Sequence, residues 1–414
     1  MFKIGNLSAN DLREKYGTPL YVYDEIQIKN NISEYVDNFK SDLYKTEIIY
    51  ASKAFSSLYM YKLVKENNIG VDVVSGGELY GVIKEKIDPT KIHFHGNNKS
   101  EAEMDMAIDY KVKNIIVDNF DELKLWAKKA PNISYELNIL LRINVGVSAH
   151  THEYIITAHP DSKFGYYIEN EDIFDSIKLI DATKNLNFYG FSTHIGSQIF
   201  DMKGFILTIE KMFELMKKTN REIKHLCLGG GCGVRYTDSD KPLTLKEFSN
   251  ILIDKVDEEI KKTGIKISEL SIEPGRSLVA NAGYQLYTIN QMKKSLNKTY
   301  YFIDGGMNDN IRPALYGAIY SVDIANKINE EKTMEVSIAG KCCESGDVLF
   351  KDVKLPKAEA GDMLVVYTTG AYGYSMASNY NRLPRPAVVF VNGSNSKLAI
   401  KRETYEDLYK NDLD

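Results

Sequence analysis

Short apolar runs rich in Ile, Val and Tyr alternate with helical patterns between about residue 46 and residue 275. Helix-start signals lie between the runs: Ser100 with Glu103 and Asn119 with Glu122 have capping-box spacing, and residues 245–262 have helical periodicity. A strand followed by a helix, repeated eight times, is typical of a (β/α)8 barrel of the TIM type. The eight expected strands are residues 47–52, 70–75, 91–95, 114–118, 138–144, 187–194, 225–229 and 269–273.

The pattern changes after residue 275. Strand-like segments such as residues 299–306, 334–341 and 363–370 follow one another with turn residues between them and few helical patterns. We therefore expect an α/β protein of two domains. The first is a barrel over residues 31–275, and the second is a separate all-β domain over residues 276–414 that the N-terminal residues 1–30 complete.

Charge and hydropathy narrow the classes of function. The 52 basic and 57 acidic residues nearly balance, and no long run of either sign occurs, which argues against nucleic-acid or membrane-surface partners. No apolar run is long enough to span a bilayer, and the first residues lack the apolar core of a signal peptide, so we expect a cytoplasmic protein. The four cysteines are too few and too poorly spaced for a disulfide framework or a paired CxxC zinc site.

Polar residues collect at the carboxyl ends of the expected barrel strands, where TIM barrels carry their chemistry. Each residue type also has an ordinary interpretation: a lone lysine near a strand end usually reaches solvent, a lone histidine is usually structural, and a triple glycine can be a tight turn. Their convergence on one end of the barrel favours a ligand site. The set is Lys53, Asp72, Ser75, His95, Asn97, Arg142, Asn144, His194, Ser197, Gly229, Gly230, Gly231, Glu273 and Arg276.

A lysine, a glycine loop and a carboxylate at one barrel mouth together suggest pyridoxal 5′-phosphate. The amine of Lys53 can form a Schiff base with the aldehyde of this cofactor. A glycine loop after a late barrel strand binds phosphate through backbone N–H groups, and Gly229, Gly230 and Gly231 occupy that place. An acidic residue such as Glu273 can pair with the ring nitrogen and raise its pKa, which keeps the ring an electron sink.

Motifs spread over residues 20–386 resemble those of the diaminopimelate decarboxylases, within the alanine-racemase-fold group of pyridoxal-phosphate enzymes. The resemblance implies decarboxylation of meso-2,6-diaminopimelate to L-lysine and carbon dioxide, the last step of bacterial-type lysine biosynthesis. The motifs that carry it are "YASKAF", "GVDVVSGGEL", "HGNNKS", "AHTHEY", "DSKFG", "HIGSQI", "LGGGCGVRY", "EPGRSLVANAG", "DGGMNDNIRPALYGA", "GKCCESGD" and "GAYGYSMASNYNRLPRP".

The resemblance also implies a role for each matching residue. Lys53 would form the Schiff base with Asp72 close by, His194 would stack on the cofactor ring, and Glu273 would pair with the ring nitrogen. Cys343 would donate the proton that replaces the lost carboxylate. The other cofactor-binding positions would be Ser197, Gly229, Gly230, Gly231, Pro274, Gly275, Arg276 and Tyr372. The substrate-binding positions would be Arg276, Arg312, Tyr316, Glu344 and Tyr372.

Two of these positions bear on the choice of substrate, and one motif bears on assembly. Arg276 and Arg312 suit a substrate with a distal carboxylate, because a guanidinium binds a carboxylate with two parallel hydrogen bonds. The family completes each site with the "CCESGD" segment of a neighbouring subunit, which implies a homodimer with shared sites and a β domain that supplies substrate and dimer contacts. Without the resemblance, Cys342 and Cys343 would be interpreted as small core residues.

Three alternatives stay open. A decarboxylase of ornithine, arginine or carboxynorspermidine would place Arg312 against a positively charged substrate. A metal-dependent barrel hydrolase would use His93 and His95 with the histidines of residues 150–152, but such enzymes pair histidines on the first strand, so we expect no metal and a structural role for His93. A catalytically inactive homologue is disfavoured by the intact set of catalytic positions.

Overall fold

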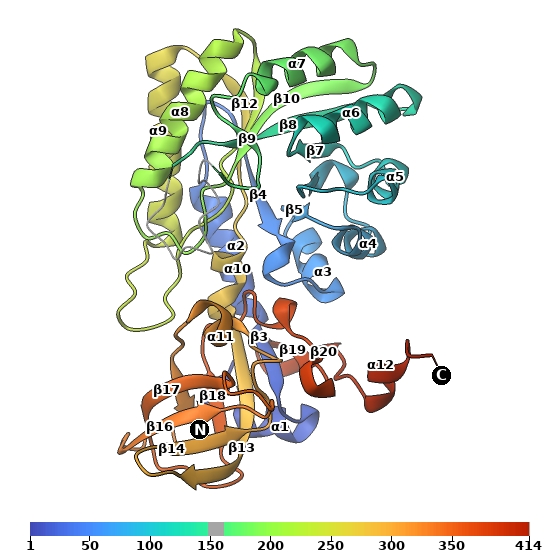
Figure 1. Ribbon diagram of the computed structural model, residues 1–414. Coiled ribbons are helices and arrows are strands. Elements are labelled where there is room, and N and C mark those ends of the chain that lie inside the picture. Colours follow the sequence, from blue (N-terminus) through green and yellow to red (C-terminus); the bar gives the residue numbers. More distant parts are fainter. Residues whose placement is uncertain (148–160, 414) are drawn as a thin grey trace. The chain divides into compact units, whose positions relative to one another are not determined.

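The computed structural model describes residues 1–147 and 161–413, which form two compact units (Figure 1). The barrel unit holds Asn31–Gly233 and Pro242–Ser277, and the β unit holds Met1–Asn30, Val234–Lys241 and Leu278–Asp414. The histidines of residues 150–152, which the metal-dependent alternative would use, lie outside the described residues. Within the described ranges, no helix is both long and apolar enough to cross a membrane.

All eight expected barrel strands are present. Each pairs in parallel with both of its neighbours, and the pairings of β12 with β4 and of β8 with β10 close the ring. The predicted (β/α)8 barrel is therefore confirmed. The strands are β4 (Lys45–Ala51), β5 (Gly70–Val73), β6 (Ile92–Phe94), β7 (Asn114–Val117), β8 (Leu137–Asn144), β10 (Leu186–Thr193), β11 (Ile223–Cys227) and β12 (Ile267–Ile272). A two-residue strand, β9 (Tyr166–Tyr167), adds a parallel pairing to β8 that the pattern did not predict.

Helices lie outside the ring of strands (Figure 1). They are α3 (Leu58–Glu66), α4 (Gly76–Lys84), α5 (Glu101–Asp109), α6 (Phe120–Lys129), α7 (Asp172–Ala182), α8 (Lys203–Thr219) and α9 (Leu245–Thr263), preceded by α2 (Glu25–Asn38) and followed by the short α10 (Arg276–Val279). The capping box expected from Ser100 and Glu103 is present at α5. Asn119 caps α6, but the side chain of Glu122 accepts from the N–H of Asp118 and from Lys99 instead of closing a second box.

Buried polar groups also occupy the barrel interior below the carboxyl ends of its strands. The rings of His93 on β6 and His225 on β11 meet edge to face, with centroids 5.7 Å apart. Nε2 of His93 lies 3.7 Å from a carboxylate oxygen of Glu47, and Nε2 of His225 lies 2.7 Å from the hydroxyl of Ser271. Both histidines are 1% exposed. His93 thus lies in the barrel interior, and its structural role stays a prediction.

Acid is expected to destabilise the barrel through His225. Burial, and then the nearby His93, lowers the pKa of His225 to about 3. Below about pH 6.5 the unfolded chain binds a proton that the folded barrel excludes, so the free energy of unfolding falls by up to about 1.4 kcal/mol per pH unit until about pH 3. His225→Gln removes this titration. Its thermal unfolding midpoint should fall less than that of the unaltered protein between about pH 7 and pH 5, and equal falls would contradict the assignment.

The β unit is built around a long mixed sheet. Its order is β17 (Val348–Leu355), β16 (Met334–Ala339), β14 (Thr299–Ile303), β13 (Gly283–Lys294), β3 (Leu20–Asp24), β19 (Ala387–Asn392) and β20 (Asn395–Ile400). The N-terminal β3 pairs antiparallel with β13 and parallel with β19, so the N-terminal segment is built into this sheet as predicted. Buried Leu20, Val22 and Leu286 belong to its core.

Smaller elements complete the β unit. β18 (Met363–Val366) pairs with β13 and with β15 (Val322–Ile324), and β1 (Lys3–Ile4) pairs with β2 (Leu7–Ser8). Three short helices, α1 (Ala9–Tyr16), α11 (Arg312–Tyr316) and α12 (Tyr405–Tyr409), make the unit mostly β where the pattern predicted an all-β domain. The segment Val234–Lys241, which lies between β11 and α9 in the chain, also belongs to it.

Candidate active site

Lys53 lies in a single turn of 3-10 helix, η1 (Ser52–Ala54), directly after β4. Its two neighbours in this turn are buried, whereas Lys53 itself is exposed. The turn packs closely against Gly275, where an added Cβ would lie 3.0 Å from the Cβ of Ala51. Lys53 therefore lies just beyond the end of β4, at the open end of the barrel. Its ammonium there avoids the cost of burial without a partner.

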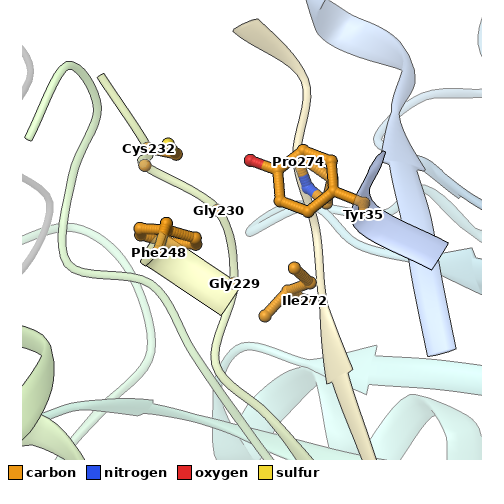
Figure 2. A pocket seen from close by; sticks show the side chains of 8 residues that line it. Tyr35, Gly229, Gly230, Cys232, Phe248, Ile272 and Pro274 are labelled. Atoms are coloured by element: carbon orange, nitrogen blue, oxygen red, sulfur yellow. The ribbon is translucent and has the colours of Figure 1, made fainter. Parts of the chain in front are cut away.

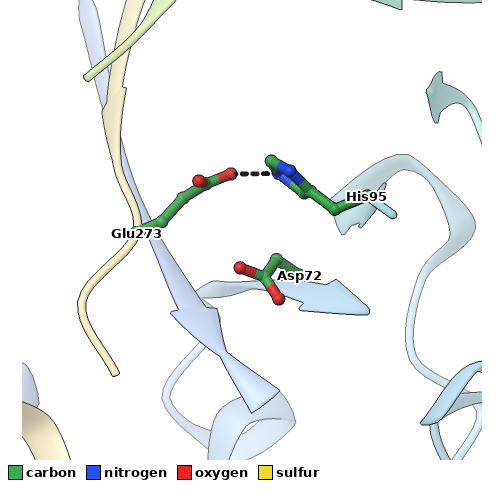
Figure 3. A group of neighbouring side chains, drawn as sticks. All are labelled: Asp72, His95 and Glu273. Carbon is green, nitrogen blue, oxygen red and sulfur yellow. Dashed lines mark hydrogen bonds and ion pairs between the residues drawn. The ribbon is translucent and has the colours of Figure 1, made fainter. Parts of the chain in front are cut away.

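Asp72, His95 and Glu273 meet at this same end of the barrel (Figure 3). Asp72 belongs to β5, and the other two directly follow β6 and β12. Nε2 of His95 lies 2.6 Å from Oε1 of Glu273. One ring nitrogen of His95 and one carboxylate oxygen from each of Asp72 and Glu273 all lie within 4.8 Å of one another. All three are buried, and Oδ1 of Asp72 has no hydrogen-bond partner in the described part of the chain.

The pKa values of the two carboxyl groups of this cluster are shifted in opposite directions. Burial, and then the charge of Glu273, raises the pKa of Asp72 well above its ordinary value, which disfavours its anionic form. Burial alone would also raise the pKa of Glu273, but the bond to His95 holds that pKa well below its usual range. Desolvation lowers the pKa of His95, so a neutral imidazole donates its Nε2–H to an anionic Glu273. These pKa directions favour Glu273 as the anion of the cluster.

His194 follows β10 and is held as a neutral ring. The backbone N–H of Gly230 donates to Nδ1 of His194 at 3.2 Å, so the ring proton is assigned to Nε2. Burial, then the charges of Lys53 and Arg142, lowers the pKa of His194 well below its ordinary value. A neutral, flat imidazole therefore lies beside the lysine turn and the glycine loop.

The glycine loop after β11 runs in close contact with the ends of both neighbouring strands. A Cβ at Gly229 would lie 2.5 Å from the carbonyl oxygen of Thr193, and a Cβ at Gly230 would overlap the carbonyl oxygen of Glu273. Gly229 and Gly231 also have positive φ angles, of 70° and 122°. Only glycine fits these positions, so the loop offers bare backbone to the site.

Figure 2 shows the glycine loop where larger side chains pack against it. The pocket here encloses no more than about 140 Å³, well below the roughly 300–1,000 Å³ of ordinary ligand pockets. The side chains that line it therefore support the loop, and the pocket is too small for a substrate. Its lining is Tyr35, Gly229, Gly230, Gly231, Cys232, Phe248, Ile272 and Pro274.

Arg276 and Ser197 form a further part of the site. Nε and Nη2 of Arg276 donate to the hydroxyl of Ser197 at 3.1 and 3.0 Å, and Arg276 is buried. The Ser197 loop adjoins the glycine loop, because the N–H of Ile199 donates to the carbonyl oxygen of Gly231 at 2.9 Å. A buried guanidinium, a hydroxyl and bare backbone amides in adjoining loops are the groups that bind a phosphate.

Arg312 is a buried cation inside the β unit. Its Nη1 donates at 3.4 Å to the hydroxyl of Tyr236 and to the carbonyl oxygen of Ala371, while its Nε has no partner within the described residues. Tyr372 has a φ angle of 61°, which is rare for a bulky residue and is typical of functional sites. Four tyrosine rings lie within 6 Å of the guanidinium: Tyr236, Tyr316, Tyr320 and Tyr372.

Cys343 and Glu344 lie on a separate exposed loop of the β unit. The buried carboxylate of Asp347 fixes this loop, because it accepts from the N–H groups of Met307 and Cys342, both at 2.7 Å. The two predicted site residues therefore point to solvent in a single chain, on a loop whose shape is already set.

Three residues at these sites received no role from the sequence. His95 had a detectable signal, because it stands at a strand end beside other polar residues. Tyr236 and Tyr320 had none, because nothing in the sequence near Arg312 indicates that residues from other loops surround it; Tyr236 is 76 positions away.

Comparison with known proteins shows the family of the chain. Residues 29–280 match the family model of the pyridoxal-dependent decarboxylases, pyridoxal binding domain. The chain is 48% identical to diaminopimelate decarboxylase of Bacillus subtilis over 99% of this chain and 95% of that protein, and 46% identical to that of Bacillus methanolicus over 97% and 94%.

A solved structure gives the same result in three dimensions. Diaminopimelate decarboxylase of M. jannaschii in complex with L-lysine superposes with a TM-score of 0.93 at 36% identity, covering 100% of this chain and 97% of that one. The fold and the family inferred from the motifs are thus confirmed. The chain belongs to the diaminopimelate decarboxylase family of pyridoxal-dependent decarboxylases.

Proposed function

We propose that the protein decarboxylates meso-2,6-diaminopimelate at its D centre and releases L-lysine and carbon dioxide, with pyridoxal 5′-phosphate as its cofactor. The observation that carries the proposal is the joint presence, at one barrel end, of an exposed lysine, an anionic buried carboxylate and a phosphate-type loop. It occurs in a chain whose near-full-length relatives are diaminopimelate decarboxylases.

The residues present fit this cofactor. The guanidinium of Arg276, the hydroxyl of Ser197 and the amides around Gly229, Gly230 and Gly231 suit the phosphate, with Pro274, Gly275 and Tyr372 as the further phosphate-side positions. Lys53 would bind the aldehyde covalently. When bound, the cofactor accepts the electron pair of the bond that breaks.

The protein's own groups would then each hold or move one charge. Glu273, as an anion, keeps a proton on the cofactor ring nitrogen. His194, as a neutral ring, would stack on the cofactor without adding a positive charge, and Asp72 would lie close to Lys53. The thiol of Cys343 returns a proton to the carbon that loses carbon dioxide.

Arg312 is the group that selects the substrate. A buried guanidinium with an unused Nε–H and aromatic walls favours a distal carboxylate and disfavours the cationic ends of ornithine, arginine and carboxynorspermidine. Arg276 of the barrel unit and Tyr316 and Tyr372 of the β unit are the other proposed substrate-binding positions. Glu344 suits the ammonium group at the same distal centre.

We infer that the active form is a homodimer in the cytoplasm. Cys343 and Glu344 are exposed on the single chain, and a role in catalysis requires that another surface cover them. A partner chain that docks on this loop would remove both from solvent and add them to its own site. Light scattering of the purified protein checks the expected dimer, and a monomer that is fully active would contradict it.

Carbon dioxide release tests the proposed activity. The purified protein with added pyridoxal phosphate is incubated separately with meso-diaminopimelate, ornithine, arginine and carboxynorspermidine. We expect release from meso-diaminopimelate alone, with L-lysine as product. Release only from a cationic substrate would keep the cofactor assignment and overturn the role of Arg312. No release from any of them would favour the inactive homologue or a metal-dependent reaction.

A further inference from the structure

We propose that His95 is a positioning residue, which holds the carboxylate of Glu273 in place and in its anionic form for the ring nitrogen of the cofactor. The inference rests on the proposed function. It assigns His95 a role that acts through Glu273 and involves no contact of its own with the substrate.

The bond between the two residues spans the barrel mouth. His95 follows β6 and Glu273 follows β12, and two strands, β4 and β5, separate these in the ring. The Nε2 to Oε1 distance is 2.6 Å, and the residues are 7% and 6% exposed (Figure 3). A buried carboxylate needs such a partner, because the loss of its hydration is costly and a charge-assisted hydrogen bond offsets part of that cost.

His95 is itself held by a second layer of contacts. Its backbone N–H donates to the carbonyl oxygen of Val73 at 2.8 Å, and the next residue, Gly96, has a φ of 115° that favours glycine. The buried ammonium of Lys99 donates to the carbonyl oxygen of Gly96 at 2.9 Å and to Glu122 at 2.8 Å. The backbone that carries the imidazole is therefore held in place, as is required of a residue that orients another group.

Asp72 explains why Glu273 needs this help. The two carboxyl groups lie in one buried cluster, and two carboxyl groups at such a separation do not both ionise readily. His95 donates to only one of them, Glu273, and so decides which carboxyl is the anion. Without the imidazole, Glu273 loses its advantage over Asp72, and the ring nitrogen loses the anion that keeps it protonated.

Cofactor binding to the apoprotein separates this role from simple packing. Dissociation constants are measured for pyridoxal phosphate and for its analogue in which a C–H group replaces the ring nitrogen, with the unaltered protein and with His95→Leu, His95→Gln and Glu273→Gln. The unaltered protein should prefer pyridoxal phosphate. His95→Leu should lose about tenfold or more of that preference, and His95→Gln, which keeps an N–H donor, should lose less.

The double variant His95→Leu/Glu273→Gln should show no smaller preference than Glu273→Gln alone, since His95 acts through Glu273. An unchanged preference in His95→Leu, or an equal loss of affinity for both cofactors, would overturn the inference and leave the proposed function intact. Failure of the unaltered protein to bind either cofactor would overturn both. If His95→Leu does not fold, His95→Phe, which keeps a ring without a donor, replaces it in the same comparison.

Discussion

Lys53→Ala should lower kcat at least about ten-thousand-fold while the thermal unfolding midpoint stays within a degree or two of the unaltered protein. The loss is large because Lys53 is the residue proposed to bind the aldehyde, and alanine has no amine to replace it. The fold should survive because Lys53 is exposed on a single turn and its truncation leaves no cavity. Single-turnover assays with pyridoxal phosphate measure the loss, with the surface variant Lys62→Ala as control. Activity retained by Lys53→Ala would contradict the role of this lysine.

The same variant tests whether sites are shared between subunits. Lys53→Ala and Cys343→Ala should each be inactive, but chains that are unfolded together and refolded should regain about a quarter of the full activity. Half of the randomly formed dimers would be mixed, and each mixed dimer would hold one site with an intact lysine and an intact cysteine. Recovery of no activity would show that each chain supplies both residues to its own site.

Arg312→Leu should lower kcat/KM for meso-diaminopimelate by about a hundredfold to a thousandfold, because a buried charge partner of the distal carboxylate is lost. The kcat/KM of Arg312→Lys should lie between those of the unaltered protein and Arg312→Leu, since lysine keeps the charge but lacks the planar guanidinium. Neither change should weaken cofactor binding, and both should leave the unfolding midpoint within a few degrees.

A truncated substrate supplies the matched control for Arg312. D-lysine keeps the D-configured centre of meso-diaminopimelate but lacks the distal carboxylate, so the unaltered protein should process it poorly and Arg312→Leu should process it no worse. The ratio of kcat/KM for meso-diaminopimelate to kcat/KM for D-lysine should therefore fall towards one in Arg312→Leu. A variant that loses both activities by the same factor would show that Arg312 supports the fold of the site instead of selecting the substrate.

The barrel could be predicted from the sequence because each strand carries its own signal. A short apolar run that ends in a polar residue identifies both the strand and the end of the barrel to which it points, and the expected run 47–52 matches β4 (Lys45–Ala51) within two residues. β9 could not be found, because two residues give no period to detect. The bond from Glu122 to the Asp118 N–H depends on how the β7 end turns into α6, which capping-box spacing alone does not encode.

The candidate site could be predicted only as a set of residues. Strand ends gave Lys53, Asp72 and Glu273, but their charges follow from burial and from contacts across the ring. The bond from His95 to Glu273 joins strands that are not neighbours, so it exists only once the barrel has closed. Of the tyrosine rings around Arg312, that of Tyr316 belongs to the same helix, α11, whereas Tyr236 is 76 positions away and no local pattern links it to Arg312.

The loop fixed by Asp347 bears on how two chains would associate. Its carboxylate already binds two backbone N–H groups, and a Cβ at Gly306 or Gly340 would overlap that carboxylate, so the loop has one compact shape within a lone chain. A partner that docks against Cys343 therefore has little chain disorder to remove. Ordering a flexible segment normally subtracts from the free energy of association, and a loop that is rigid beforehand avoids most of that loss. Encounter should then resemble the docking of two preformed surfaces, without a coupled folding step.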